Sequence, residues 1–125
     1  MLLDTHILLW FLDDSPRLPQ KVREQIEDAD RLAVSIVTLW EIAIKLSIKK
    51  LELQFEFQEL PAFLDQLGIE VIPITFADVQ CYVTLPLHHR DPFDRLLVAQ
   101  GMNRSLSLVS ADTKFDPYAI SRVWE

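Results

Sequence analysis

Glycine and cysteine are scarce in this chain of 125 residues, and long apolar runs are missing. The sequence has two glycines and one cysteine, and no stretch is rich in glycine or serine. The single Cys81 excludes an intramolecular disulfide and a zinc site built from several cysteines, and its apolar neighbours indicate a core thiol. No window approaches the roughly 18 uninterrupted apolar residues that a membrane-spanning helix needs, so we expect no membrane association.

The start of the chain has no recognisable secretory signal. Leu2 and Leu3 are followed at once by Asp4, and no basic segment precedes an apolar run. We therefore expect a cytoplasmic protein.

The composition is that of a folded, acidic domain. Half of the residues are apolar, including three Trp and seven Phe, so the chain can bury a sizeable core. Its length suits one compact domain, which we expect to span residues 1–125. The net charge of −7 weighs against nucleic-acid binding, which usually needs a basic surface. Carboxylates that hold divalent cations would reduce this charge, and a few Lys and Arg could then contact phosphates.

Short apolar segments alternate along the chain with longer helical patterns. We expect strands at 1–3, 32–34, 69–74 and 106–109, and a possible fifth at 120–124. We expect helices at 7–12, from Pro19 to about 29, at 36–48, 60–68, 75–85 and 92–104. This alternation predicts parallel pairing with helices on both faces of the sheet. The expected fold is an α/β three-layer sandwich around a central, mainly parallel sheet of four or five short strands.

Four acidic residues are expected at one edge of this sheet. Asp4 ends the first strand, Glu41 lies in the helix after the second, Asp94 lies in the first turn of a late helix, and Asp112 follows the fourth strand. Ligands of open parallel sheets bind beyond the carboxyl ends of the strands. Two carboxylates ~4 Å apart repel by about 4 kcal/mol at an effective dielectric near 20. A hard cation such as Mg²⁺ or Mn²⁺ relieves this repulsion in an all-oxygen site.

Each of these acids also has a purely structural alternative. Asp4 could cap the following helix, and Glu41 could complete a capping box or pair with a lysine one turn later. Asp91 and Asp94 flank Pro92 in a favourable helix start, so capping and catalysis are equally open for Asp91. Asp112 could cap a short turn. The metal-site interpretation rests on the coincidence of four acids.

One stripe of polar residues runs along the otherwise apolar helix at 36–48. Thr38, Glu41, Lys45 and Lys49 follow one another at spacings of three, four and four. A largely buried helix with one acidic and basic stripe favours the wall of a cleft.

Four segments of the chain match the sequence motifs of a known family. These segments are Leu2–His6, Ser35–Ala43, His89–Gln100 and Leu108–Asp112. In this order and spacing they resemble the PIN (PilT N-terminus) domain family, and within it the VapC-type toxins of bacterial toxin–antitoxin pairs. The resemblance implies a three-layer α/β fold, an acidic Mg²⁺ or Mn²⁺ pocket and RNA endonuclease activity. It also implies a small antitoxin as partner and a homodimer, for which exposed apolar side chains are expected at Trp10, Phe11, Phe55 and Phe57.

The resemblance assigns roles by position in the family motifs. The expected catalytic and metal-binding residues are Asp4, Glu41, Asp94 and Asp112. Asp91 is an additional acid found in part of the family, and it is a further metal-ligand candidate. Thr5 and Ser110 are expected to support the acids. The expected reaction is hydrolysis of RNA phosphodiesters by water activated by one or two metal ions, which leaves a 5′-phosphate and a 3′-hydroxyl.

Several basic residues are candidates for contacting RNA phosphates. They are Lys45, Arg90 and Arg95, with Lys49 as a further candidate. Arg95 could instead be an ordinary charge on a helix surface. We interpret His88 and His89 as surface residues of a Pro-flanked loop, and His6 as a helix-start residue.

Two other classes of protein fit a small acidic α/β chain. A receiver-type signalling domain needs an acidic pair after its first strand and a lysine after its last, whereas only Asp4 follows the first strand here. A catalytically silent interaction module would keep the fold without the chemistry, and the four intact acids weigh against it.

Overall fold

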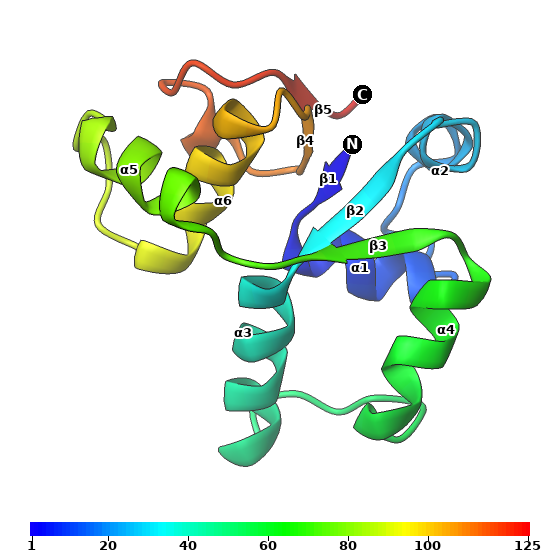
Figure 1. Ribbon diagram of the computed structural model, residues 1–125. Coiled ribbons are helices and arrows are strands. Elements are labelled where there is room, and N and C mark those ends of the chain that lie inside the picture. Colours follow the sequence, from blue (N-terminus) through cyan, green and yellow to red (C-terminus); the bar gives the residue numbers. More distant parts are fainter.

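The computed structural model describes residues 1–125 and contains five strands, six α-helices and two short 3-10 helices (Figure 1). The strands are β1 (Leu2–Leu3), β2 (Leu32–Ser35), β3 (Ile69–Ile72), β4 (Leu108–Val109) and β5 (Arg122–Val123). The α-helices are α1 (Thr5–Leu12), α2 (Gln20–Glu27), α3 (Ile36–Ser47), α4 (Leu60–Gln66), α5 (Phe76–Thr84) and α6 (Pro92–Asn103). The 3-10 helices are η1 (Phe57–Glu59) and η2 (Thr113–Phe115). None of the helices combines the length and the apolar character that crossing a bilayer requires.

The five strands form one sheet in the order β3-β2-β1-β4-β5, and every neighbouring pair is parallel. The chain builds outward from β1 through β2 to β3 and then returns to the other side of β1 with β4. The strand order therefore reverses between β1 and β4. In open parallel sheets this reversal opens a crevice at the carboxyl ends of the two strands, where ligands bind.

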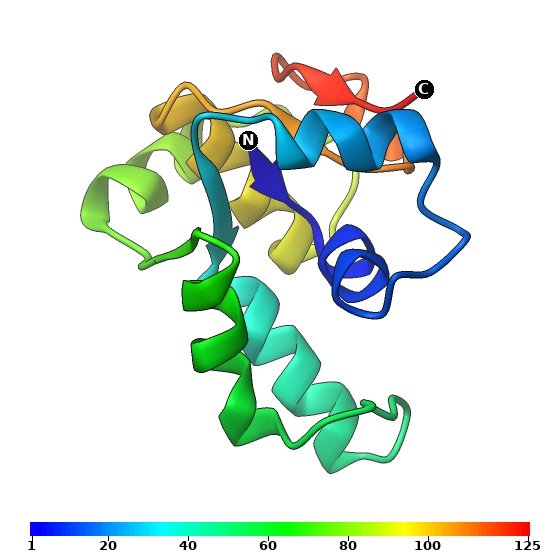
Figure 2. The same ribbon diagram turned by 90° about the vertical axis from the view of Figure 1, so that its right-hand side faces the viewer.

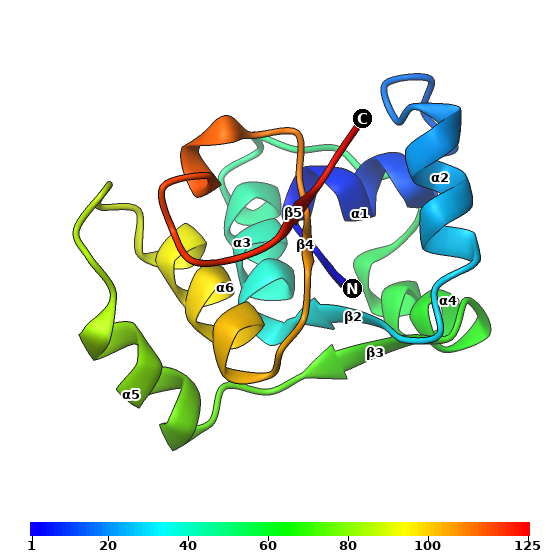
Figure 3. The same cartoon turned by 90° about the horizontal axis from the view of Figure 1, so that it is seen from above.

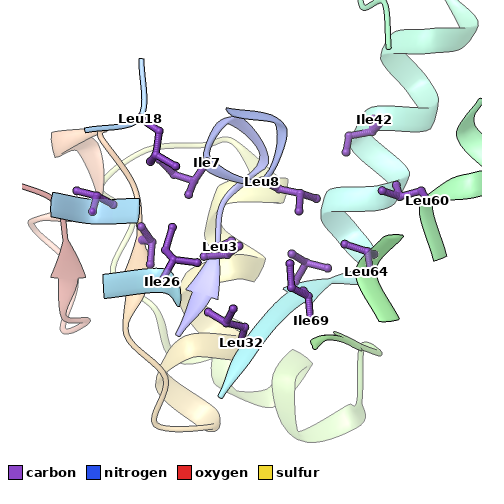
Figure 4. Close-up of a cluster of buried hydrophobic side chains, with 13 residues drawn as sticks. Leu3, Ile7, Leu8, Leu18, Ile26, Leu32, Ile42, Leu60, Leu64 and Ile69 are labelled. Atoms are coloured by element: carbon purple, nitrogen blue, oxygen red, sulfur yellow. The ribbon is translucent and has the colours of Figure 1, made fainter. Parts of the chain in front are cut away.

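Alternate residues of the central strands enter two separate apolar cores. Leu3 and Val34 belong to the core that α1, α2, α3 and α4 cover, whereas Leu2 and Ala33 belong to the core beneath α6. Figure 4 shows the first core, in which Ile42 of α3 lies beside side chains of α4. Figure 3 shows α5 and α6 on one side of the strands and α1 and α2 on the other. The predicted three-layer α/β arrangement is confirmed.

Four strands, β1, β3, β4 and β5, are shorter than the sequence pattern predicts. β3 ends at Ile72 because Pro73 has no N–H group to donate to the sheet, and Ile74 is exposed. β4 begins only at Leu108, because the N–H of Leu106 donates to the carbonyl of Gly101 (2.8 Å) and closes the last turn of α6. Beyond the sheet, α3 and α4 extend together in one direction (Figure 2).

Candidate active site

Asp4 occupies the point where β1 turns into α1. Its carboxylate accepts a hydrogen bond from the N–H of Ile7 (2.9 Å) and so caps the helix. Burial raises the pKa of Asp4, while hydrogen bonds from the Ser110 hydroxyl and from Ile7 lower it. Ser110 directly follows β4, so this contact joins the ends of the two strands between which the strand order reverses.

Glu41 reaches the same edge from α3. The hydroxyl of Thr5 donates to its carboxylate (2.5 Å), and the Nζ of Lys45 lies 3.5 Å from the other oxygen. Because Thr5 is buried beside Asp4, it holds Glu41 next to the end of β1. The hydroxyl of Thr5 thereby places Glu41 beside Asp4, the residue that precedes Thr5 in the chain.

Asp94 and Asp112 are joined by a cation from the chain itself. The Nζ of Lys114 lies 2.6 Å from Asp94 Oδ2 and 3.1 Å from Asp112 Oδ2. Burial raises the pKa of Asp94 to about 6 against the opposing effect of Lys114. In Asp112 the ammonium of Lys114 and a backbone N–H outweigh burial and lower the carboxyl pKa. Burial lowers the pKa of the Lys114 ammonium, but the two carboxylates outweigh it and raise the pKa overall.

A shallow hollow connects the two halves of this acidic edge. Asp4 and Asp112 line it together with His6, Trp10 and Arg17. His6 is exposed and stacks on Trp10, at 5.9 Å between ring centroids. The hollow lies at the carboxyl ends of β1 and β4, where the sheet topology predicts a ligand.

The structure thus gathers the four predicted acids at one edge, and it also bears out four structural alternatives, which are three helix caps and the pairing of Glu41 with Lys45. Asp4 caps α1, Asp112 caps η2 through the N–H of Lys114 (3.0 Å), and Asp91 caps α6 through the N–H groups of Phe93 (2.9 Å) and Asp94 (3.4 Å). A carboxylate has two oxygens, so capping leaves one oxygen free for another ligand.

The donor set matches a hard divalent cation in its chemistry. Its members are carboxylates and hydroxyls, which are the oxygen ligands that Mg²⁺ and Mn²⁺ accept. The Lys114 ammonium already balances Asp94 and Asp112 from between their oxygens. In this arrangement no three His, Cys, Asp or Glu side chains are grouped closely enough to hold a metal ion.

The structure corrects the expectation for Arg95. The residue is only 7% exposed, and its guanidinium donates to the carbonyl of Pro86 (2.9 Å) and the hydroxyl of Tyr118 (3.3 Å). It also lies over the ring of Tyr82, at 4.9 Å from the centroid. Arg95 is therefore neither a free phosphate-binding group nor a surface charge.

The other basic candidates are accessible, but they differ in position. Lys45 is partly exposed on α3 and pairs with Glu41, and Arg90 is exposed in the loop before α6. Lys49 lies beyond the end of α3 in a left-handed conformation (φ 58°), so it does not extend the polar stripe of that helix.

The two histidines of the loop before α6 are not equivalent. His88 is exposed as predicted, although its ring contacts Tyr118. His89 is half-buried, packs edge-on against Phe115 and Tyr118, and has no hydrogen-bond partner on either ring nitrogen. Burial lowers the pKa of His89. The prediction of a surface residue was wrong for His89.

Sequence reasoning missed two cations at the acidic edge, Lys114 and Arg17. Lys114 follows Asp112 by two residues, and η2 turns its ammonium back between the carboxylates. The proximity of a lysine to a predicted ligand was a usable signal. Arg17 follows α1 in a Pro-rich turn that has no periodicity, and no sequence pattern places it in the hollow.

The exposed apolar side chains are mostly other residues than those predicted. Trp10, Phe11 and Phe55 are partly buried against the first core. Phe57 alone of the predicted group is exposed. The most exposed apolar side chains are Trp40, Phe76, Val83 and Leu87.

A parallel sheet with an acidic site at the reversal of its strand order defines the class of this protein, and comparison supplies the family. The profile of the PIN domain matches residues 1–120, and the chain belongs to the PIN domain family. The chain is 29% identical over 117 residues to "Ribonuclease VapC22" of Mycobacterium tuberculosis, a match that covers 91% of this chain and 88% of that protein.

Solved structures share the fold. The chain is similar to one in the structure of VapBC2 from Rickettsia felis bound to a DNA fragment from their promoter, at TM-score 0.74 and 18% identity, with 98% of this chain and 96% of that chain covered. A chain in the structure of FitAcB from Neisseria gonorrhoeae matches at TM-score 0.68 and 18% identity, with 98% and 96% covered. A toxin–antitoxin complex from Klebsiella pneumoniae matches at TM-score 0.69 and 20% identity, with 98% and 95% covered.

Proposed function

We propose that this chain is a Mg²⁺- or Mn²⁺-dependent endoribonuclease and the toxin of a type II toxin–antitoxin pair. The observation that carries the proposal is the gathering of Asp4, Glu41, Asp94 and Asp112 at the carboxyl edge of a PIN-family sheet. The similarity to a protein named as a ribonuclease supports the same activity.

Asp4 and Asp94, with Glu41 or Asp112, are the residues that would hold the cation, and Asp91 is a further candidate. Such an ion lowers the pKa of water and offsets charge on a phosphodiester. The protein itself contributes the positions and the charges of the carboxylates that would hold this ion. Thr5 orients Glu41 and Ser110 orients Asp4, while the burial of both hydroxyl residues excludes water from behind the acids.

The ammonium of Lys114 has to leave Asp94 and Asp112 for a divalent cation to bind between them. Once released, its charge becomes available to an RNA phosphate at the same edge. Arg17 in the hollow, Lys45 on α3 and Arg90 before α6 are the other cations that would contact phosphates.

An antitoxin is the proposed partner, and a homodimer is the proposed assembly. Structures of VapBC2 and FitAB complexes share the fold, which supports an assembly of this kind. Lys114 demonstrates that a side-chain cation fits between Asp94 and Asp112. An Arg or Lys of an antitoxin could bind there in the same manner and displace the metal ion. If an antitoxin still inhibits RNA cleavage after every one of its basic residues has been replaced by a neutral one, this mode of inhibition is refuted.

Replacement of Asp4 by Asn tests the catalytic proposal. Asp4→Asn keeps the cap of α1 but removes one charged ligand, so we expect RNA cleavage with Mn²⁺ to fall at least about 100-fold. Wild-type cleavage should also stop when a chelator is added. Asp65→Asn, at an exposed position of α4, is the matched control and should cleave normally. Cleavage by Asp4→Asn at the wild-type rate would make the assignment wrong.

A further inference from the structure

An aromatic pair lies where α3 and α6 meet, and each ring belongs to the residue that precedes a candidate acid in the chain. Trp40 of α3 immediately precedes Glu41 and is 60% exposed. Phe93 of α6 immediately precedes Asp94, and the centroids of the two rings are 5.2 Å apart at an interplanar angle of 63°. The helices α3 and α6 pack against each other (Figures 1 and 3). Two helices that each supply a candidate catalytic acid therefore also meet through an aromatic contact.

The packing of the fold does not account for Trp40. The other two tryptophans, Trp10 and Trp124, are partly buried and pack against the first core. The centroids of their rings are 6.3 Å apart. Trp40 is not among the buried residues of either core. Ile36, one turn earlier on α3, is exposed as well. Leaving so large an apolar ring in water forgoes the free energy of burial, which indicates a ligand for it.

The position of the two rings next to the candidate acids favours an unpaired nucleobase as their ligand. A ribonuclease substrate has to lie against Glu41 and Asp94, so its bases come within reach of the adjoining rings. Stacking on aromatic side chains is a common way of binding single-stranded nucleic acid. Lys45 of α3 and Arg90 before α6 are accessible cations on the same two segments and can contact neighbouring phosphates. Bases in a duplex remain stacked on each other and cannot reach the rings.

We propose that Trp40, supported edge-on by Phe93, is a stacking platform for an unpaired base of the RNA beside the scissile phosphate. The inference rests on the proposed ribonuclease function and deepens it, because it selects single strands and loops over duplex RNA.

Fluorescence anisotropy of a short labelled oligo(A) tests the platform. The Asp4→Asn background prevents cleavage during the measurement, and the additional change Trp40→Ala should weaken binding by about 5- to 100-fold. Trp40→Phe should recover most of the affinity, because a phenyl ring still stacks. With an oligonucleotide of the same length made of abasic sites, Trp40→Ala should have no effect. A role of Trp40 in folding alone would not depend on the presence of bases.

Phe76→Ala is the matched control, because Phe76 on α5 is 75% exposed but distant in sequence from all four acids. The Phe76→Ala variant should bind oligo(A) with the same affinity as the parent protein. Equal affinity of the Trp40→Ala and parent proteins would overturn the platform. So would a change in oligomeric mass without loss of RNA affinity, since the patch would then be a protein interface. If wild-type protein cleaves RNA with Mn²⁺ while Trp40→Ala binds oligo(A) normally, the platform fails and the ribonuclease proposal stands. If wild-type protein neither cleaves nor binds RNA, both fail.

Discussion

Individual residues at the acidic edge serve the fold and the site together. Asp4 and Asp112 each cap a helix with one oxygen, and each also takes part in the acidic edge, Asp4 through Ser110 and Asp112 through Lys114. A capping pattern in the sequence is therefore no argument against a catalytic role. Lys114 is the least expected member, because it neutralises two of the acids that a metal ion would need.

Replacement of Lys114 by Met should separate the stability of the site from its capacity to bind metal. Without the ammonium, Asp94 and Asp112 repel each other without compensation, so we expect the metal-free protein to lose about 1 kcal/mol of unfolding free energy. Mn²⁺ no longer has a competitor, so the rise in melting temperature on adding Mn²⁺ should be larger than in wild type. Differential scanning fluorimetry with chelator and with Mn²⁺ measures both effects.

Lys21→Met is the control for this substitution, because Lys21 is exposed on α2 and forms no ion pair in the structure. Lys21→Met should leave the melting temperature unchanged, both with chelator and with Mn²⁺. A Lys114→Met protein whose response to Mn²⁺ equals that of wild type would show that the ammonium does not compete with metal.

At the scale of elements, the sequence predicts all six helices and the parallel sheet, because the apolar spacing within each segment is regular and four of the helices begin at a side-chain cap. Its errors fall where a distant segment decides the outcome. Arg95 follows Asp94 on a predicted surface helix, but the chain around Tyr118 returns over it and buries it. The alignment of strand ends made it predictable that the four acids lie at one edge, whereas the inward turn of Lys114 depends on η2.

A buried carboxylate clamps α5 to α6, and no sequence pattern indicated it. Asp78 is fully buried and caps α5 with Thr75, while its oxygens accept hydrogen bonds from Gln100, Asn103 and Arg104. Burial alone would raise the pKa of Asp78, but these donors outweigh it and leave the pKa well below its usual value. The ionised form is therefore more stable in the folded protein than in the unfolded chain.

Asp78→Asn should lower the unfolding free energy at neutral pH by about 3 kcal/mol, because it leaves Arg104 without its buried partner. The pKa of Asp78 is lower in the folded protein than in the unfolded chain, where it is about 4. Ionised Asp78 therefore stabilises the folded protein above about pH 4, and this stabilisation is lost as the pH falls toward the pKa of the folded state. Wild-type stability should therefore fall between about pH 4 and pH 2 more steeply than that of Asp78→Asn. Urea unfolding at a series of pH values measures the difference, with Asp65→Asn as an exposed control. Parallel pH profiles for the wild type and Asp78→Asn would contradict the clamp.

At the scale of the whole molecule, the net charge of −7 opposes the approach of any polyanion. The acidic edge concentrates part of that charge at the proposed site, and few cations surround it. Arg17, Lys45 and Arg90 are accessible, and Lys114 joins them once a divalent ion displaces it, so phosphate contacts should number about four. Affinity for RNA then has to come mainly from the bound divalent ion and from base stacking, and only to a small extent from release of counterions.

The salt dependence of RNA binding tests this view of the molecule. With about four phosphate contacts, the slope of log K against log salt concentration should be near −3 for a single strand, at fixed divalent concentration. Arg17→Gln removes one contact and should reduce the slope by about 0.7, whereas Arg31→Gln, whose partner Glu70 lies on β3, should leave it unchanged. Anisotropy of labelled oligo(A) in the Asp4→Asn background provides the measurement. A slope steeper than about −5 would reveal a basic RNA-binding surface elsewhere on the protein. Assembly of two chains could create such a surface. The acidic edge would then not be the main determinant of RNA affinity.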